Sequence, residues 1–189
     1  TAERFKLPIL FNADDVKRVM EKWETLDYHR EFRISDFGFR ISLYNAGHIL
    51  GSAFVAVEEN STEEIAAGAT ASALAMTGTK KIVFSGDLGN SPAPLLGDKD
   101  NLPETDYVVM ESTYGDRLHE KTDQRKEMLE DMVEDTVKKG GVLLIPAFAM
   151  ERTQELIFEL DQLASQGRIP RAPIFIDSPL AIKLIEVYK

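Results

Sequence analysis

The spacing of apolar residues changes along this chain, and the change constrains its fold more than any other feature. In the first third of the chain apolar side chains recur at every second position, as in Phe39, Ile41 and Leu43. A period of two predicts β-strands with one buried face. Later the period lengthens to three or four residues over 122–139 and 151–166, which predicts two helices. The sequence therefore predicts an α/β fold.

Short apolar runs separate and follow these two helices. Residues 142–145 and 174–176 are rich in valine, isoleucine, leucine and phenylalanine, and each predicts a strand. Strands that alternate with helices are typical of a parallel sheet. Residues 60–79 carry few large side chains and predict a loop inserted between strands.

A helix is also predicted near the start of the chain, where Asn12 can serve as the N-cap. Its apolar side chains are spaced by three and four residues, which predicts that they pack in the core. These side chains are Val16, Val19, Met20 and Trp23.

The run from residue 80 to residue 90 joins a short strand to a carboxylate. Ile82–Phe84 predicts a buried strand, Gly86 breaks it, and Asp87 follows at its carboxyl end. In α/β proteins, strand ends of this kind hold catalytic and metal-binding carboxylates. Asp87 in a Gly-Asp pair is also ordinary turn chemistry, so both roles stay open at this point.

Composition limits the chemistry that the chain can use. The 189 residues allow one domain or two small ones, and no apolar run approaches the length of a transmembrane helix. Cysteine is absent, so a metal site must use His, Asp and Glu, and a cytoplasmic location is expected. The net charge of −10 argues against nucleic-acid binding unless bound metal ions reverse the local charge.

Three residues that could hold a metal each follow a predicted strand, namely His48, Asp87 and Glu111. They lie too far apart in sequence to form a local motif, so only the fold can bring them together. The other histidines are weaker candidates: His29 lies in a polar surface stretch, and a packing role is favoured for His119.

Several short motifs, in this order, resemble the metallo-β-lactamase superfamily and its β-CASP branch, which includes RNA-processing nucleases such as ribonuclease J. The motifs occupy residues 45–52 (NAGHILGS), 84–89 (FSGDLG), 111–117 (ESTYGDR), 145–149 (IPAFA), 152–156 (RTQEL) and 177–181 (DSPLA). The resemblance implies part of an αββα sandwich over residues 1–118, followed by part of a parallel α/β β-CASP domain over 119–189. Glu151 stands where that family usually has glycine.

The resemblance also implies a zinc-dependent ribonuclease with two zinc ions. By similarity, His48 is a zinc ligand, Asp87 bridges both ions, and Glu111 orients active-site histidines through hydrogen bonds. Arg152 and Ser178 are candidate contacts to the substrate phosphates, although Ser178 is favoured more strongly as the cap of the following helix.

The family's His-x-His-x-Asp-His cluster does not occur before His48, and its late histidine motifs would lie beyond Lys189. We therefore expect the middle of a longer enzyme, and expect this chain alone to bind zinc poorly and to be inactive. The expected partners are an RNA substrate and either a second copy or a processing complex, without a membrane. An inactive β-CASP scaffold subunit and a β-CASP DNA nuclease remain as alternatives.

Overall fold

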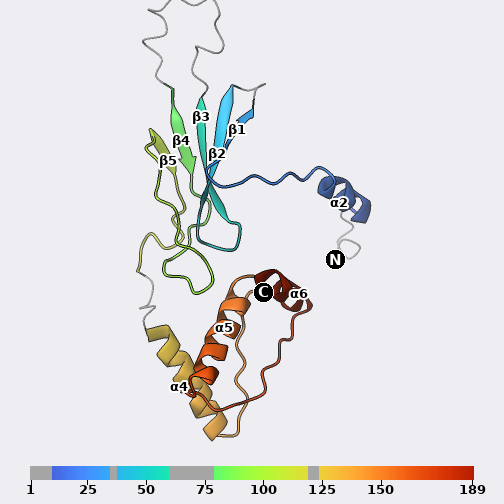
Figure 1. Cartoon of the computed structure of the whole chain (residues 1–189), viewed down its shortest axis with the longest axis vertical. Coiled ribbons are helices and arrows are strands. Elements are labelled where there is room, and N and C mark those ends of the chain that lie inside the picture. Colours follow the sequence, from blue (N-terminus) through green and yellow to red (C-terminus); the bar gives the residue numbers. More distant parts are fainter. Residues whose placement is uncertain (1–9, 35–37, 60–78, 119–123) are drawn as a thin grey trace, which may run out of the picture.

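The computed structural model describes residues 10–34, 38–59, 79–118 and 124–189. A sheet and one short helix form the first half of the described chain, and helices form the second half (Figure 1). Among the described residues, no helix is both long enough and apolar enough to cross a membrane. The elements are α2 (Ala13–Met20), β1 (Glu31–Ile34), β2 (Phe39–Asn45), β3 (Ala53–Glu59), β4 (Lys81–Phe84), β5 (Tyr107–Val109), α4 (Arg125–Lys138), α5 (Arg152–Ser165) and α6 (Pro179–Tyr188).

The five strands form one mixed sheet in the order β1-β2-β3-β4-β5. The pairs β1–β2, β2–β3 and β3–β4 are antiparallel, and β4–β5 is parallel. Ala56 lies opposite Val83 in the register, and both side chains are buried together with Ala46 and Phe54. The strands predicted from the period of two and from Ile82–Phe84 are confirmed.

A second core lies between α4 and α5. Leu129 and Val133 of α4 pack with Leu160 and Leu163 of α5, and Ile169 closes the cluster. Because buried residues recur at intervals of three or four along both helices, the predicted helices are confirmed. The two cores share no buried residue. The division between residues 118 and 119 stays a prediction, because residues 119–123 lie outside the described ranges.

The strands predicted at 142–145 and 174–176 are wrong for this structure. Neither run has regular secondary structure, and within the described ranges neither joins a sheet. Val142 and Phe175 are 93% and 87% exposed. A strand needs a neighbour to accept its backbone hydrogen bonds, and apolar composition alone supplies none. The α/β class is nevertheless confirmed, because the mixed sheet is combined with helices.

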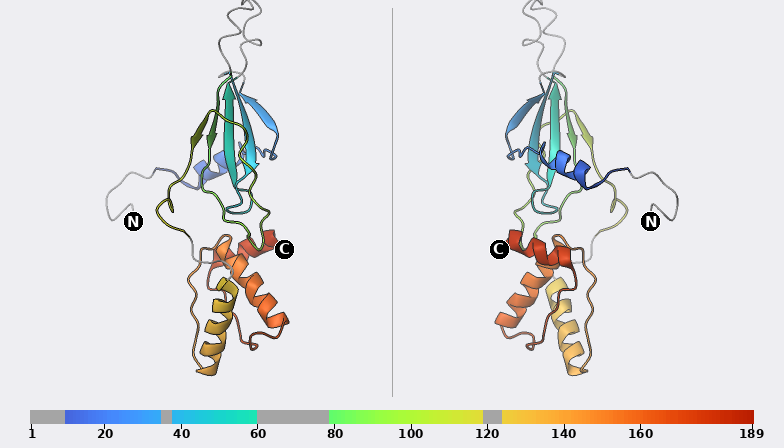
Figure 2. Two further views of the ribbon diagram at one scale, coloured as in Figure 1. Left: turned by 90° about the vertical axis from the view of Figure 1, so that its left-hand side faces the viewer. Right: turned by 90° about the vertical axis from the view of Figure 1, so that its right-hand side faces the viewer.

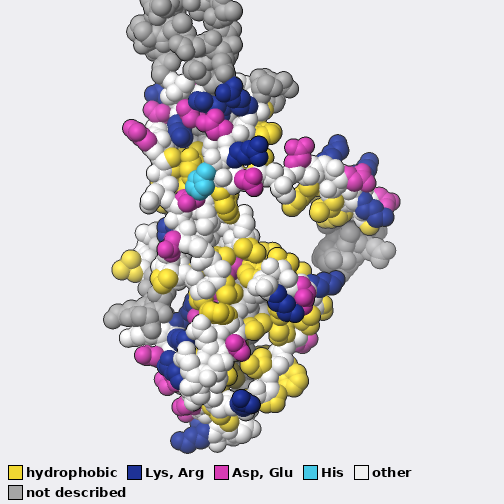
Figure 3. All heavy atoms as spheres, in the orientation of Figure 1, with side chains coloured by type: hydrophobic (Ala, Val, Ile, Leu, Met, Phe, Trp, Pro, Cys, Tyr) yellow, Lys and Arg dark blue, Asp and Glu magenta, His cyan; other side chains and the backbone are white. Residues whose placement is uncertain are grey.

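Helix α2 begins as predicted but does not pack as predicted. The Asn12 side chain accepts hydrogen bonds from the amides of Asp14 and Asp15, which confirms the N-cap. The prediction that its apolar stripe is core is wrong, because α2 has no buried residue. Figure 3 shows apolar side chains gathered on one side of this helix. Local capping fixes the helix, and no described element covers that side. The predicted inserted loop, 60–79, falls outside the described residues except for Thr79.

The difference in burial between two leucines predicts different losses of stability when each is replaced by alanine. Leu163 is fully buried in the second core, whereas Leu180 at the start of α6 is 57% exposed. We expect Leu163→Ala to lower the free energy of unfolding by about 2–5 kcal/mol, because it leaves a cavity. The matched control Leu180→Ala should cost less than about 0.5 kcal/mol. Urea unfolding of both variants measures the difference, and equal losses would contradict the position assigned to α5.

Asp106, which lies where β4 and β5 begin, is expected to make a pH-dependent contribution to the free energy of unfolding. Asp106 accepts hydrogen bonds from the Lys81 amide at 2.9 Å and from Lys80 Nζ at 3.2 Å, and these bonds hold the Asp106 pKa below its usual value. Because the folded state favours the carboxylate, its stabilisation is complete above about pH 4 and is lost as the pH falls. The gap in urea midpoint between the chain and Asp106→Asn should therefore shrink between about pH 6 and about pH 2.5. A gap of constant size would show that the charge contributes nothing.

Candidate metal centre

Three strands of the sheet run in the same direction and end at one edge. Strands β2 and β4 are both antiparallel to β3, and β5 is parallel to β4. His48 follows β2, Asp87 follows β4, and Glu111 follows β5. The topology therefore places all three predicted residues at the same edge. Figures 1 and 2 show that the loops at this edge face the helices of the second half.

The loop after β2 holds His48 through a network centred on Ser52. Ser52 Oγ accepts hydrogen bonds from the amides of His48 at 3.0 Å and Ile49 at 3.2 Å. The Ala46 amide donates to the Ser52 carbonyl at 3.1 Å, which closes the loop. Gly47 has a φ of +63°, a conformation that favours glycine. These contacts fix the backbone on both sides of the His48 imidazole.

The loop after β4 holds Asp87 through Glu111. Glu111 Oε1 accepts a hydrogen bond from the Leu88 amide at 2.7 Å, and the Glu111 amide donates to Ser85 Oγ at 3.0 Å. The carboxylate of Glu111 therefore acts on the backbone next to Asp87. Its expected action on active-site histidines stays a proposal.

The two loops meet at Gly89 with almost no space between their backbones. The Gly89 amide donates to the Ala46 carbonyl at 2.8 Å. A Cβ atom placed on Gly89 would lie 1.7 Å from the Gly47 carbonyl oxygen, which is far inside van der Waals contact. Only glycine fits at this position, because any side chain would push the two loops apart.

This contact brings His48 and Asp87 together. Nε2 of His48 lies 3.9 Å from Oδ2 of Asp87, and their side chains are 38% and 74% exposed. That distance is too long for a hydrogen bond. Donor atoms on one tetrahedral zinc ion stand about 3.3 Å apart, so a small side-chain rotation would let both atoms bind one ion. The pair fits a metal as part of a site, but within the described ranges no group of three or more ligands forms.

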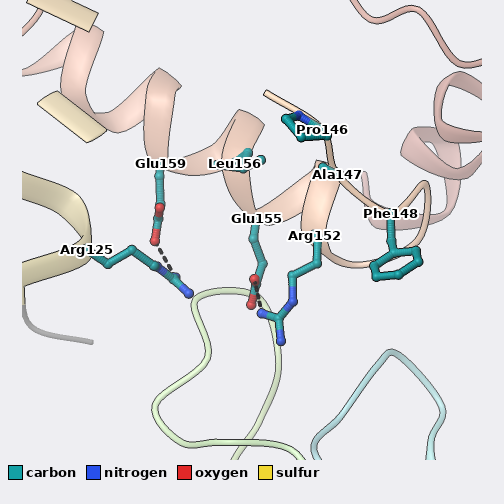
Figure 4. Close-up of a pocket in the computed structure, with 8 residues that line it drawn as sticks. All are labelled: Arg125, Pro146, Ala147, Phe148, Arg152, Glu155, Leu156 and Glu159. Carbon is teal, nitrogen blue, oxygen red and sulfur yellow. Dashed lines mark hydrogen bonds and ion pairs between the residues drawn. The ribbon is translucent and has the colours of Figure 1, made fainter. Parts of the chain in front are cut away.

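The predicted substrate contacts lie in the second half. Arg152 opens α5 and pairs with Glu155 at 2.7 Å, and Arg125 of α4 pairs with Glu159 at 2.5 Å. Both pairs line a cavity of about 560 Å³, and Phe148 lies at its rim (Figure 4). The arginines thus share an opening, although each is already paired with a carboxylate.

Ser178 and the remaining histidines have other surroundings. Ser178 Oγ accepts a hydrogen bond from the Ala181 amide at 3.2 Å, so Ser178 is the N-cap of α6, as the capping interpretation predicts. His29 lies 3.2 Å from an Asp100 carboxylate oxygen and makes an edge-to-face contact with Tyr44. His119 lies outside the described residues.

The sequence pattern did not identify a buried carboxylate that joins the two halves. Glu151 is 2% exposed, and its Oε2 accepts hydrogen bonds from Tyr188 Oη at 2.6 Å and from the Leu50 amide at 3.3 Å. The Tyr188 pKa is raised to about 12, mainly because the hydroxyl is removed from water and secondly because it faces the Glu151 carboxylate. The only signal in the sequence was Glu151 itself, because the family that the motifs resemble usually has glycine at this position. Nothing in the sequence pointed to Tyr188.

Comparison with known proteins identifies relatives along nearly the whole chain. Residues 153–189 match the Beta-Casp domain. The chain is 33% identical over 178 residues to a ribonuclease of Thermus thermophilus, covering 94% of this chain and 36% of that protein. It is 34% identical over 183 residues to the cleavage and polyadenylation specificity factor 73 of Drosophila melanogaster, covering 96% and 24%.

An RNase J-like protein of Methanocaldococcus jannaschii is 31% identical over 175 residues, covering 90% of this chain and 37% of the relative. The chain thus spans about a third or less of the length of these three relatives. The matched domain and the relatives confirm the family that the sequence motifs indicated. The chain belongs to the β-CASP branch of the metallo-β-lactamase superfamily.

Proposed function

We propose that this chain is part of a zinc-dependent ribonuclease that hydrolyses RNA phosphodiester bonds in RNA processing or decay. The observation that carries the proposal is the 3.9 Å approach of His48 Nε2 to Asp87 Oδ2, made by two separate loops at one sheet edge. The names of the relatives, a ribonuclease and a cleavage factor among them, support the same chemistry.

The ligand roles follow from the chemistry of the two side chains. Imidazole nitrogen and carboxylate oxygen are ligands that zinc accepts, and a carboxylate has two oxygens with which to bridge two ions. When bound, zinc supplies an activated water for attack on the phosphodiester. The remaining ligands are assigned to parts of the protein beyond the described residues.

The surrounding residues keep these ligands in place. Ser52 holds the backbone of His48, and Glu111 holds the backbone beside Asp87. Gly89 sets the distance between the two loops. Because a backbone hydrogen bond connects the two loops, the backbone positions of the ligands are set before any ion binds, which limits the reorganisation needed at the reacting centre.

The proposed substrate contacts are two guanidinium groups and one hydroxyl group. Arg125 and Arg152 place the guanidinium groups around one cavity, and guanidinium groups bind phosphate through paired hydrogen bonds. The hydroxyl hydrogen of Ser178 can donate to a phosphate while its oxygen caps α6. Because each arginine is paired with a glutamate of the cavity wall, a phosphate has to compete with those carboxylates for the guanidinium groups.

Removal of either ligand should abolish cleavage by the full-length protein. We expect His48→Ala and Asp87→Asn to lower the cleavage rate of a labelled single-stranded RNA by more than about 100-fold, and a chelator to do the same. The matched control is His29→Asn, which changes a histidine outside the site. Asparagine tolerates its positive φ of 61°, so activity should be unchanged.

Cleavage that survives both the chelator and Asp87→Asn would contradict the proposal. Cleavage of DNA but not of RNA would favour the DNA nuclease. A full-length protein that cleaves neither nucleic acid would favour the scaffold subunit.

Gly89→Ala tests whether the loop contact matters for activity. The new methyl group would overlap the Gly47 carbonyl oxygen and force the two loops apart. Because a displacement of about 1 Å can cost about 100-fold in rate, we expect a loss of that size. In the control Gly97→Ala, the nearest atom to the added Cβ lies 3.8 Å away, so full activity is expected. Equal activities of the two variants would show that the loop spacing is not needed.

A further inference from the structure

The residue before α5 has a strained backbone. Glu151 has φ 65° and ψ −63°, and the Arg152 amide donates to the Met150 carbonyl at 2.9 Å. Together these describe a three-residue turn that is rare for residues with a Cβ atom. Conformations of this kind are unfavourable and persist where the surrounding structure holds them. Glycine would adopt the turn more easily, so the glutamate side chain needs its own explanation.

The side chain does not cap its own helix. Glu151 makes no side-chain hydrogen bond to the first turn of α5. Its carboxylate is buried, with one oxygen bonded to Tyr188 Oη and the Leu50 amide and the other, Oε1, without a hydrogen-bond partner among the described residues. Burial of a carboxylate with only one oxygen bonded is unfavourable. Neither the capping of α5 nor the stability of the second core accounts for it.

What the carboxylate reaches is the loop that holds His48. Leu50 lies two residues after His48. Ser52 Oγ accepts hydrogen bonds from the amides of the two residues before Leu50, His48 and Ile49. The Glu151–Leu50 bond therefore joins the start of α5 to the backbone that fixes the imidazole. The hydroxyl of Tyr188, near the end of α6, orients the same carboxylate oxygen. Its raised pKa is consistent with a protonated donor at neutral pH.

We propose that Glu151 is a positioning residue, which holds the His48 loop against α5 and α6 and so sets the place of the imidazole relative to Asp87. The inference rests on the proposed function, because the purpose of that placement is metal-dependent cleavage. It assigns a role to the strained turn: the turn directs the carboxylate out of α5 and into the loop. Tyr188 completes the bridge from the other helix.

Three variants of the full-length protein separate the effect of the Glu151 hydrogen bonds from the effect of its strained backbone. Glu151→Gly relieves the backbone strain and removes both hydrogen bonds, whereas Glu151→Gln keeps an oxygen that accepts from Leu50 and Tyr188. Tyr188→Phe removes the bond that orients the carboxylate, together with the contact between the Tyr188 hydroxyl and the Leu50 backbone. Four quantities are measured for each: amide hydrogen exchange over residues 48–51, the melting temperature, kcat and KM for RNA cleavage.

In Glu151→Gly we expect amide exchange at Leu50 to quicken by about tenfold, as loss of one hydrogen bond to a charged group implies. We expect kcat to fall by about tenfold, with KM and the melting temperature nearly unchanged. Glu151→Gln should recover most of both losses, and Tyr188→Phe should fall between the two.

Unchanged exchange at Leu50 in Glu151→Gly would overturn the proposal. A loss of kcat that follows only a lower melting temperature, equal in the Gly and Gln variants, would also overturn it, since that is a purely structural role. The exchange measurement does not depend on activity. If the unaltered protein cleaves no RNA, the proposed function fails while the bridge is still tested.

Discussion

The candidate site depends on the backbone contact between two loops at Gly89. With no side chain at this position, the amide of Gly89 reaches the Ala46 carbonyl, and the loops after β2 and β4 lie against each other. The strand directions bring the loops to one edge, and the glycine then removes the last obstacle between them. His48 and Asp87 are thereby held at a spacing close to that of two ligands on one ion. A larger residue would leave the sheet intact and separate the ligands.

A second constraint joins this edge to the helical half. The buried carboxylate of Glu151 bonds the His48 loop on one side and Tyr188 of α6 on the other. The guanidinium groups of Arg125, on α4, and Arg152, on α5, line one cavity. Arg152 is the first residue of α5 and follows Glu151 directly. The same turn therefore begins the helix that carries a proposed phosphate contact and fixes the loop that carries a proposed metal ligand.

Much of the local structure was predictable because it depends on nearest neighbours. The N-cap at Asn12 and the cap at Ser178 both depend on residues within one turn of chain. The errors arose where pairing decides the outcome. The apolar run at 142–145 has strand composition but no neighbour in a sheet among the described residues, and the stripe on α2 has no covering element there.

By itself, the sequence determined the α/β class, the absence of cysteine ligands, and the motifs that place His48, Asp87 and Glu111 after strands. These properties are carried by residue type and local spacing. Only the tertiary structure decided that the three strands end at one edge, that Gly89 brings two of the residues together, and that Glu151 reaches Leu50 across 101 positions of the chain. The physical reason is that these distances depend on strand direction and backbone clearance, which no local pattern encodes.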